Sequence, residues 1–431
     1  MIKRLCYMGL IIISAYSNIE ITDKSSMTYH NAHSSKGQYC TKQIWEDVEL
    51  NHIKFFDINE IGTLSDIDDF YKDGIPGDIK GDSKIVAYEW FAGFYNDDYN
   101  KEEKFYRWVM KSGKDMLLNY SSDIHPMGND YYFDMCNRKL VNKRVKYLTQ
   151  KAKKYNIDGY FFDWANSRYL YDDSRFSDMR DIIKRRYPNK DYKDCIKTFF
   201  KKLKKNNILI ISNQAYRDED ILEYVDYDMV ESYLTNIESK REMVVNDRLV
   251  NIGITSYDSF DDILYYFNLL NGYKDRYREK GFKNFIYVNY ITPLLEESED
   301  GYITKKPIDD LFYTYGMILM NEFIPYTEVP FNRNFETTEL YSIKLGKPQG
   351  EIKRNNGFIY RYFDNGIILS SHLTKPLDIV IDKLEEGRYI YDIKNDNNYL
   401  VKDGKIYMTI YPSFDKVSGG YKPISLILVY K

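Results

Sequence analysis

Two short apolar runs that each end in a carboxylate are the segments best suited to do chemistry. The run 157–164 is apolar from Tyr160 to Phe162 and then meets Asp163. The run 227–232 has the same arrangement, with Glu231 in the corresponding place. Strands of a parallel sheet covered by helices are apolar on both faces, and in barrels of such strands the catalytic side chains lie at the carboxyl ends. Two carboxylates delivered to one rim predict glycoside hydrolysis, in which one protonates the leaving oxygen while the other attacks or activates water.

Short apolar runs that alternate with amphipathic stretches indicate βαβ units and a parallel sheet. Eight runs have this character: 52–57, 85–89, 116–120, 157–163, 208–213, 228–231, 285–289 and 323–326. The stretch between the third and fourth runs places Val141, Val145, Leu148, Ala152 and Tyr155 on one face at a period of 3.6 residues. Ser259 followed by Asp262 is a capping-box start for another helix. The sequence therefore predicts an α/β fold built on a (β/α)8 TIM barrel.

The last hundred residues change to a period of two, which is typical of antiparallel strands. Phe358, Tyr360 and Tyr362 share one face, and Asn365–Gly366 and Asp403–Gly404 are expected hairpin turns. We therefore expect four segments: a signal peptide at 1–17, a linker at 18–40, the barrel at 41–331 and a small antiparallel β-sandwich domain at 332–431.

The N-terminal segment has the pattern of an export signal. Lys3 and Arg4 precede an apolar stretch at 5–13, and Ala15 and Ser17 have the small-residue spacing that a signal peptidase requires. The apolar stretch is short for a membrane span, which takes about 20 residues. These features predict a secreted, periplasmic or cell-surface protein without stable membrane insertion after the signal is removed.

Four cysteines occur, and removal of the signal takes Cys6 away. Cys195 lies on the apolar stripe of a predicted helix, where a free thiol behaves as a small hydrophobic group. We therefore expect any internal disulfide to join Cys40 and Cys136.

Charge and composition exclude some partners. The 61 basic and 65 acidic residues are interspersed and leave a net charge of −4, so no basic face for nucleic acid is indicated. The 44 tyrosines suit stacking on sugar rings, although AT-rich codon usage would also raise Tyr, Asn, Lys and Ile together. The five histidines lack paired ligand spacing, so we expect no metal and no cofactor. We expect a monomer with a polysaccharide substrate.

Polar and aromatic side chains cluster at the ends of the predicted strands, as a sugar-binding rim requires. Besides the catalytic candidates Asp163 and Glu231, the expected substrate-binding residues are Asp57, Glu89, Trp90, Tyr120, Trp164, Asn213, Gln214, Asn289 and Tyr290. The alternative for each acid is that it caps a strand or pairs with a nearby Lys or Arg. The same alternative applies to the acidic loops at 97–98, 172–173, 218–220 and 296–300, which would otherwise form a funnel for a cationic polymer.

The segments Asp158–Asp163 and Met229–Ser232 resemble the endo-α-1,4-polygalactosaminidase family of glycoside hydrolases. The resemblance covers the barrel, and it implies an Asp after the fourth strand and a Glu after the sixth, which match Asp163 and Glu231. The tail, with segments 345–348 and 361–366, is similar to the β domain that follows the barrel in many uncharacterised glycosidases. The resemblance implies a secreted hydrolase of an exopolysaccharide rich in amino sugars of the galactosamine type.

Several points stay open at the level of sequence. Asp163 is assigned as nucleophile or electrostatic stabiliser and Glu231 as general acid/base, but the roles can be exchanged. Carboxylates about 5 to 5.5 Å apart would imply retention and a wider gap inversion. The alternative function is a catalytically silent glycan-binding or surface-structural protein on the same scaffold, because a fold alone does not establish turnover.

Overall fold

The computed structural model describes residues 27–30 and most of 57–431. The gaps in the second range are 72, 76, 121–124, 127, 129, 232–233, 246–247, 289–293, 299–300, 306–307, 330–342, 344, 356 and 416–419.

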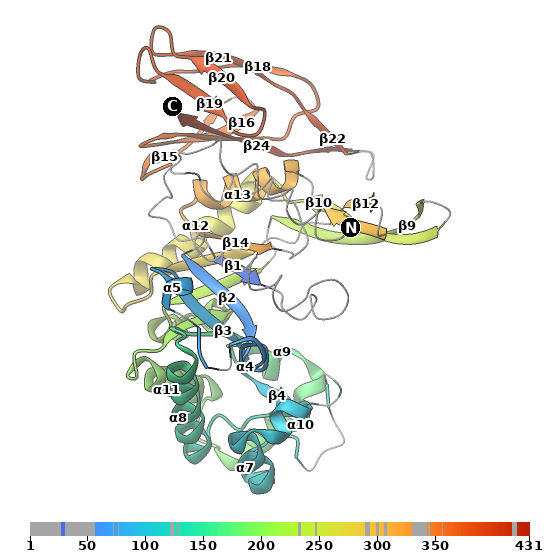
Figure 1. Cartoon of the computed structure of the whole chain (residues 1–431), viewed down its shortest axis with the longest axis vertical. Coiled ribbons are helices and arrows are strands. Elements are labelled where there is room, and N and C mark those ends of the chain that lie inside the picture. Colours follow the sequence, from blue (N-terminus) through green and yellow to red (C-terminus); the bar gives the residue numbers. More distant parts are fainter. Residues whose placement is uncertain are drawn as a thin grey trace.

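A closed barrel of parallel strands forms the first part of the chain (Figure 1). In chain order its strands are β1 (Met27–His30), β2 (Ile58–Thr63), β3 (Lys84–Trp90), β6 (Gly159–Asp163), β7 (Leu209–Asn213), β8 (Tyr227–Glu231), β11 (Asn284–Val288) and β14 (Ile324–Val329). Each strand pairs with the next one in this order, and β14 pairs with β1 to close the sheet. The α/β class with a C-terminal β domain is therefore confirmed.

Two expectations about the strands are wrong, and one more falls mostly outside the described residues. Residues 27–30 form a barrel strand, although 18–40 was predicted to be a linker. Of the first predicted strand, 52–57, the structure describes Asp57 alone, which directly precedes β2 at Ile58. The predicted strand 116–120 lies outside the barrel, and Leu117 makes an isolated antiparallel bridge with Phe133. One barrel strand, β1, was not predicted, and one predicted strand, 116–120, is not in the barrel, so the total number of strands before Asp163 is unchanged. Asp163 therefore does end the fourth barrel strand, and Glu231 the sixth.

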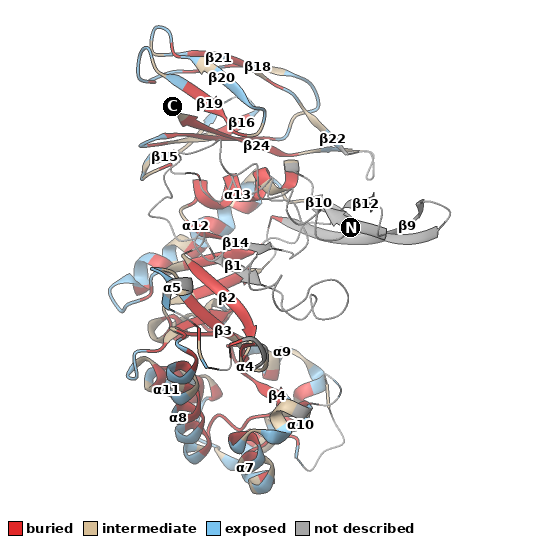
Figure 2. Cartoon of the chain, in the orientation of Figure 1, coloured by how far each residue is buried: buried red, intermediate tan, exposed pale blue. Residues whose placement is uncertain are grey.

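Helices connect the barrel strands and cover the sheet. They are α4 (Leu64–Phe70), α5 (Gly77–Lys80), α8 (Arg138–Tyr155), α9 (Arg168–Asp172), α10 (Ser177–Arg186), α11 (Tyr192–Lys204), the 3-10 segment η4 (Ala215–Tyr224), α12 (Phe260–Arg278) and α13 (Ile308–Met320). Helix α8 has the predicted apolar face, which includes Val141, Leu148 and Ala152 and is buried (Figure 2). The Asn137 side chain caps its first turn, and Ser259 caps α12 as the sequence predicted.

An insertion between β3 and α8 stands at the carboxyl end of β3. It contains β4 (Gly93–Tyr95), α6 (Asp98–Glu102), α7 (Lys104–Ser112), the 3-10 turn η2 (Gly113–Asp115) and β5 (Asp130–Tyr132). Strands β4 and β5 pair in an antiparallel manner, with Gly93 opposite Tyr132. A Cβ atom at Gly93 would lie 2.0 Å from the Tyr131 carbonyl oxygen, so the pairing requires glycine there.

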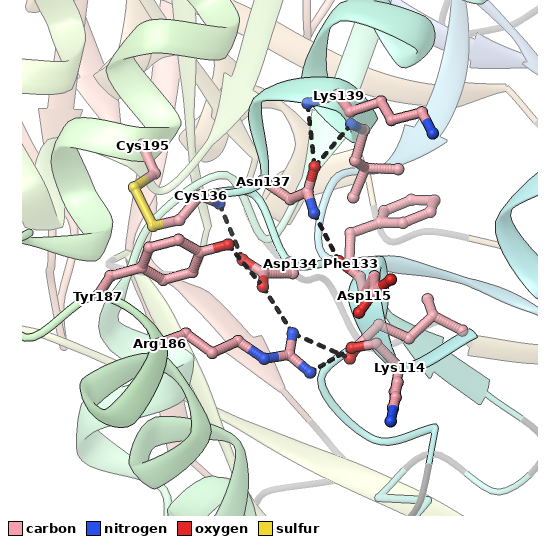
Figure 3. Close-up of polar contacts among 12 residues, drawn as sticks. Lys114, Asp115, Phe133, Asp134, Cys136, Asn137, Lys139, Arg186, Tyr187 and Cys195 are labelled. Carbon is pink, nitrogen blue, oxygen red and sulfur yellow. Dashed lines mark hydrogen bonds and ion pairs between the residues drawn. A yellow bond between two sulfur atoms is a disulfide. The ribbon is translucent and has the colours of Figure 1, made fainter. Parts of the chain in front are cut away.

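A disulfide and an ion pair fasten this insertion to the helix layer (Figure 3). Cys136 is joined to Cys195 of α11, so the expected Cys40–Cys136 pairing is wrong. The two cysteines meet because Cys136 lies beside the start of α8, which packs against α11; Cys40 lies outside the described residues. Asp134 accepts hydrogen bonds from Arg186 Nη1 (2.7 Å) and the Tyr187 hydroxyl (3.1 Å) of the α10 segment.

Two further hairpins leave the barrel at the rim that carries Glu231. β9 (Thr235–Val245) pairs with β10 (Arg248–Tyr257) after β8, and β12 (Leu294–Ser298) pairs with β13 (Gly301–Lys305) after β11.

The C-terminal domain consists of antiparallel sheets. A six-stranded sheet has the order β15 (Pro348–Asn355), β16 (Phe358–Phe363), β17 (Gly366–Ser371), β24 (Ile424–Tyr430), β19 (Tyr389–Asp392) and β20 (Asn397–Leu400). The remaining pairs are β18 (Leu377–Ile381) with β21 (Ile406–Ile410), and β22 (Ser413–Asp415) with β23 (Gly420–Lys422).

The six-stranded sheet buries both of its faces. On one face Phe358, Tyr360 and Tyr362 pack in a core shared with β18 and β21, as their alternation predicted. The other face covers α13, which lies between this sheet and the barrel (Figure 1). Gly316 of α13 lies so close to β24 that a Cβ atom would be 2.6 Å from the Ser425 Cβ. The barrel and the sheet therefore share one continuous core.

The two predicted hairpin turns differ in outcome. Asp403 and Gly404 both have positive φ angles, as a type I′ turn requires, and they lie between the bridged residues Lys402 and Lys405. The other turn lies one residue earlier than predicted, because Phe363 pairs with Gly366 and leaves Asp364 and Asn365 as the loop. Pro307, expected to open α13, lies outside the described residues. None of the helices in the described part of the chain has the length and apolar character needed to cross a membrane.

The disulfide generates a stability prediction. Replacing both Cys136 and Cys195 with Ser should lower the free energy of unfolding by about 2 to 4 kcal/mol, because the bridge closes a loop with a sequence separation of 59. Denaturant unfolding with and without reductant measures this. A wild-type protein that unfolds identically in both conditions, and identically to the double variant, would contradict the prediction.

Candidate active site

The inner face of the barrel changes from apolar to polar toward its carboxyl end. Side chains two residues apart on a strand point to the same face. The apolar layer inside the barrel consists of Ile58, Val86, Phe161, Ile211, Met229, Ile286, Val288 and Ile324. Two positions further along five neighbouring strands stand Glu60, Tyr88, Asp163, Asn213 and Glu231. We call these five residues the polar layer.

Asp163 accepts hydrogen bonds from three described donors. Its Oδ2 atom is 2.8 Å from the Tyr88 hydroxyl, and its Oδ1 atom is 2.9 Å from the Trp164 backbone nitrogen and 2.8 Å from Asn213 Nδ2. Donors aimed at a carboxylate favour its ionised form and fix its orientation. Burial and the charge of Asp163 raise the pKa of Tyr88 well above its usual range, so its hydroxyl stays a donor at neutral pH.

The Asn213 amide joins the two catalytic candidates. The Nδ2 atom that contacts Asp163 also donates to Glu231 Oε1 at 2.7 Å. Both partners are acceptors, which orients the amide with its nitrogen toward them. Because each carboxylate oxygen lies within 2.8 Å of the same nitrogen, the two oxygens are separated by no more than twice that distance. A contact this short between the nearest oxygens is compatible with the carboxyl separation of retaining glycosidases, about 5 to 5.5 Å.

Glu60 is a member of the polar layer that the sequence reasoning missed. It is 2% exposed, and its Oε2 atom has no hydrogen-bond partner among the described residues. Burial and the neighbouring charge of Asp163 raise the pKa of Glu60 well above its usual range, which favours its uncharged form. An acid inside the apolar segment Ile58–Ile61 could have indicated this residue. Because the strand was predicted at 52–57, Glu60 lay beyond its end. Tyr88 was missed because the adjacent acid, Glu89, was predicted to face the rim, and neighbouring residues of a strand lie on opposite faces.

Three predicted rim residues take other positions, and each expectation is corrected here. Glu89 points away from the barrel interior because it neighbours the inward Tyr88, and it forms a buried ion pair with Arg144 of α8 at 2.8 Å. Asp57 precedes β2 and therefore lies at the opposite, amino-terminal end of the barrel. Tyr120 ends the segment 116–120, which is not a barrel strand, and packs its ring on Gly113.

Gln214 lies at the rim, and its role in substrate binding stays a prediction. Its side chain accepts a hydrogen bond from Arg217 at 3.3 Å.

The other predicted rim residues differ in how far they are exposed and in what they contact. Trp164 is partly exposed directly after Asp163 and has a φ angle of 58°, a conformation that costs free energy in a bulky residue. Trp90 is only 6% exposed because Tyr95 stacks on it. Asn119, which also ends a predicted strand, holds β5 through the Tyr132 nitrogen. Asn289 and Tyr290 lie outside the described residues.

A buried carboxylate positions Asn213. Asp228 of β8 accepts from the Ser212 hydroxyl (2.6 Å) and from the backbone nitrogens of Ala215 (2.9 Å) and Tyr216 (2.8 Å). These bonds fasten the residues on both sides of the Asn213–Gln214 turn. Burial raises the pKa of Asp228 to about 7 against the effect of these donors.

Most acids of the described loops have structural partners, which favours this role over a funnel for a cationic polymer. Asp97 and Asp173 cap helical turns, and Asp220 pairs with Lys197 at 2.8 Å. Asp218 is buried and accepts from the Ser167 backbone nitrogen, and Glu219 pairs with Arg276. These acids therefore have structural partners, and nothing is described of the side chains at 296–300. Among the described residues, no group of three or more His, Cys, Asp or Glu side chains could hold a metal ion.

Comparison with known proteins agrees with this geometry. The sequence profile of hypothetical glycosyl hydrolase family 15 matches residues 78–367, more than half of the chain. The chain therefore belongs to this family, and it is a glycoside hydrolase. The match includes Asp163, Asn213 and Glu231 and begins after Glu60. No curated protein matches the chain in sequence.

Solved structures of similar architecture are also glycosidases. An Anoxybacillus α-amylase has 10% sequence identity and a TM-score of 0.51, with 94% of this chain and 98% of that chain covered. An α-amylase from Geobacillus thermoleovorans has 10% identity and a TM-score of 0.49 over the same shares of the two chains. The glycoside hydrolase domain of PelA from Pseudomonas aeruginosa has 13% identity and a TM-score of 0.38, covering 72% of this chain and 95% of that chain. At such identities the likeness to the Anoxybacillus enzyme establishes the fold alone.

The shared amide generates a prediction about activity. Asn213→Ala should lower kcat about 100-fold while the protein stays folded, because both carboxylates lose the donor that fixes them. Steady-state rates and the circular dichroism of folded protein measure this. Asn206→Ala is the matched control, since the Asn206 amide donates to the Lys202 carbonyl on the surface. Equal rates for the two variants would contradict a role for Asn213 in the site.

The buried acid generates a prediction about pH. Because its pKa is raised in the folded protein, the stability associated with Glu60 is present below about pH 4.5 and is lost as the pH rises toward the folded pKa. The variant Glu60→Gln keeps the size of the side chain and has no proton to lose, so its free energy of unfolding relative to wild type should increase as the pH rises above about 4.5 and should level off at the folded pKa. Glu351→Gln, at an exposed position of β15, is the control with no such trend. Parallel pH curves for wild type and Glu60→Gln would show that Glu60 is charged in the folded protein.

Proposed function

We propose that this glycoside hydrolase cleaves a polysaccharide by a retaining, two-carboxylate mechanism. The observation that carries the proposal is the single Asn213 nitrogen lying between Asp163 and Glu231. The closeness of the two carboxyl oxygens supports a retaining mechanism, in which one carboxylate attacks the sugar directly, over an inverting mechanism, in which a water molecule stands between the base and the sugar.

Asp163 is the proposed nucleophile and Glu231 the acid/base. The donors from Tyr88, Trp164 and Asn213 fix the orientation of the Asp163 carboxyl group, as a nucleophile requires. In the first step an Asp163 oxygen forms a bond to the anomeric carbon, the glycosidic C–O bond breaks, and Glu231 gives its proton to the leaving oxygen. In the second step Glu231 takes a proton from water, the water oxygen attacks the anomeric carbon, and the ester bond to Asp163 breaks.

An amino-sugar polymer of the galactosamine type is the proposed substrate class. Support comes from the resemblance of Asp158–Asp163 and Met229–Ser232 to the polygalactosaminidase motifs. Burial, followed by the charges of Asp163 and Asp130, raises the pKa of Tyr95. Carboxylates this close to the rim would favour a protonated amino group of the substrate.

Export to the cell surface, the periplasm or the medium is the proposed location. The Cys136–Cys195 disulfide supports it, because such bonds persist mainly in oxidising compartments. The N-terminal pattern of Lys3, Arg4 and the apolar stretch 5–13 supports the same conclusion.

Activity on defined polymers tests the proposal. Wild-type protein should release reducing ends from a partly deacetylated galactosamine polymer, and Asp163→Asn and Glu231→Gln should each lower the rate by a factor of at least about 10³. Starch serves as the comparison polymer, because the similar folds include amylases. Release that persists in both variants would overturn the assignment of these two residues.

The stereochemistry of the product tests the mechanism separately. Proton NMR of the first sugar released should show the anomeric configuration of the substrate, because two displacements at one carbon restore it. Inversion would mean that the carboxylates separate far enough to admit a water molecule when substrate binds.

A further inference from the structure

A tyrosine ring that the sequence reasoning did not select is exposed beside the catalytic residues. Tyr95 ends strand β4 and stacks on Trp90, with ring centroids 4.9 Å apart and planes inclined by 19°. Trp90 is 6% exposed, whereas Tyr95 is 41% exposed. One face of the Tyr95 ring is therefore covered by Trp90, so much of its exposed surface belongs to the opposite face.

The position of Tyr95 relative to Asp163 follows from strand pairing. Trp90 of β3 is the direct neighbour of Asp163 of β6 in the barrel register. The Trp90 ring also meets the edge of Trp164, the residue after Asp163, at a centroid distance of 6.0 Å. The charge of Asp163 reaches Tyr95 and contributes to its raised pKa. The Trp90 ring therefore lies between the Tyr95 ring and the strand end that carries Asp163.

The surroundings of Tyr95 hold the ring in place. The Asn100 side chain donates to the Tyr95 carbonyl oxygen at 2.8 Å, and Asn100 is itself held by Asp97. Below the stack, Tyr132 of β5 meets Trp90 edge-on at 5.0 Å. Arg144 of α8 donates to the Trp90 carbonyl oxygen at 2.9 Å. The stacked pair of Tyr95 and Trp90 is therefore held in place by the protein itself.

The contacts of Asp134 extend this support from β5 to the helix layer. Asp134 follows β5 directly and is held by Arg186 and Tyr187 (Figure 3). The Cys136–Cys195 disulfide lies two residues further along the chain. A platform fixed in this way loses little conformational entropy when it receives a flat ligand.

We propose that the open face of Tyr95 is the platform of a sugar-binding subsite adjoining the catalytic pair, where a pyranose ring of the polysaccharide stacks by its apolar C–H face. The inference rests on the proposed function, because the ligand is a further residue of the same polymer. Aromatic faces bury apolar surface and leave the sugar hydroxyls free to reach solvent or polar side chains. Tyr95 does not take part in bond cleavage; it selects substrates long enough to reach the subsite.

Substitution of Tyr95 tests the subsite. Tyr95→Ala should raise KM for the polymer about 10-fold and change kcat little, while Tyr95→Phe, which keeps the ring, should stay within about 2-fold of wild type. Tyr265→Ala is the matched control, since Tyr265 of α12 is 67% exposed and distant in the chain from the insertion. A fall in thermal stability with unchanged KM would overturn the subsite and leave Tyr95 as a cover for Trp90. Equal losses for the Ala and Phe variants would also overturn it, because the hydroxyl and not the ring would then matter.

A binding measurement separates this inference from the proposed function. The galactosamine polymer is the probe, and its retardation of Asp163→Asn and of the Asp163→Asn, Tyr95→Ala double variant is compared by affinity electrophoresis. The double variant should bind about 10-fold more weakly than the single variant. If wild-type protein releases no reducing ends but this difference persists, the hydrolase proposal fails and the subsite stands. If wild-type protein is active and the two variants bind equally, the subsite fails and the hydrolase proposal stands.

Discussion

The whole site depends on two carboxyl groups being held close together by one amide. The Asn213 Nδ2 atom lies between Asp163 and Glu231 and donates to both, so a single group sets their separation. The proposed mechanism requires Glu231 to carry a proton in its first step, so the two groups do not both bear a negative charge at that point. Burial and the neighbouring charge of Asp163 raise the pKa of Glu60, the third acid of the layer.

The alignment of neighbouring barrel strands brings the two carboxyl groups and the amide together. Neighbouring strands β6, β7 and β8 deliver Asp163, Asn213 and Glu231 at equivalent inward positions, one after another around the rim. The Asp228 carboxylate fixes the turn after Asn213 from outside the barrel, and the Tyr88 hydroxyl holds Asp163 from the adjoining strand. The insertion after β3 then places an aromatic stack over the same rim. Catalytic and binding elements therefore share one rigid support, which suits a reaction that needs close positioning.

Sequence patterns predicted the parts of this architecture that depend on local chemistry. The buried runs ending in Asp163 and Glu231, the apolar face of α8 and the Ser259 cap all follow from nearest neighbours along the chain. The alternation at Phe358, Tyr360 and Tyr362 likewise predicted the face that packs in the C-terminal core. Asn213 was selected as a substrate-binding residue because it ends a predicted strand together with the other polar residues of the rim, although its position between the two carboxyl groups was not foreseen.

The errors concern features that depend on distant contacts. The segment 116–120 has the composition of a strand, but β6 and not this segment pairs with β3. The Cys136–Cys195 bond requires α8 and α11 to lie together, which helical periodicity alone does not reveal. Glu89 directly follows the inward-facing Tyr88 and therefore lies on the outer face of β3. Glu60 lies in β2, beyond the predicted strand 52–57. Trp90 was expected to face the sugar, but Tyr95, five residues later, covers it.

The central claim is that Asp163 bonds directly to the sugar, and intact-protein mass spectrometry tests it most directly. Protein quenched during turnover, with the acid/base step slowed by Glu231→Gln and an activated substrate supplied, should gain the mass of one glycosyl unit. Proteolysis should then locate the added mass on the peptide that contains Asp163, and Asp163→Asn should abolish it. A protein that releases sugar steadily without any adduct, or with an adduct on another residue, would contradict the account.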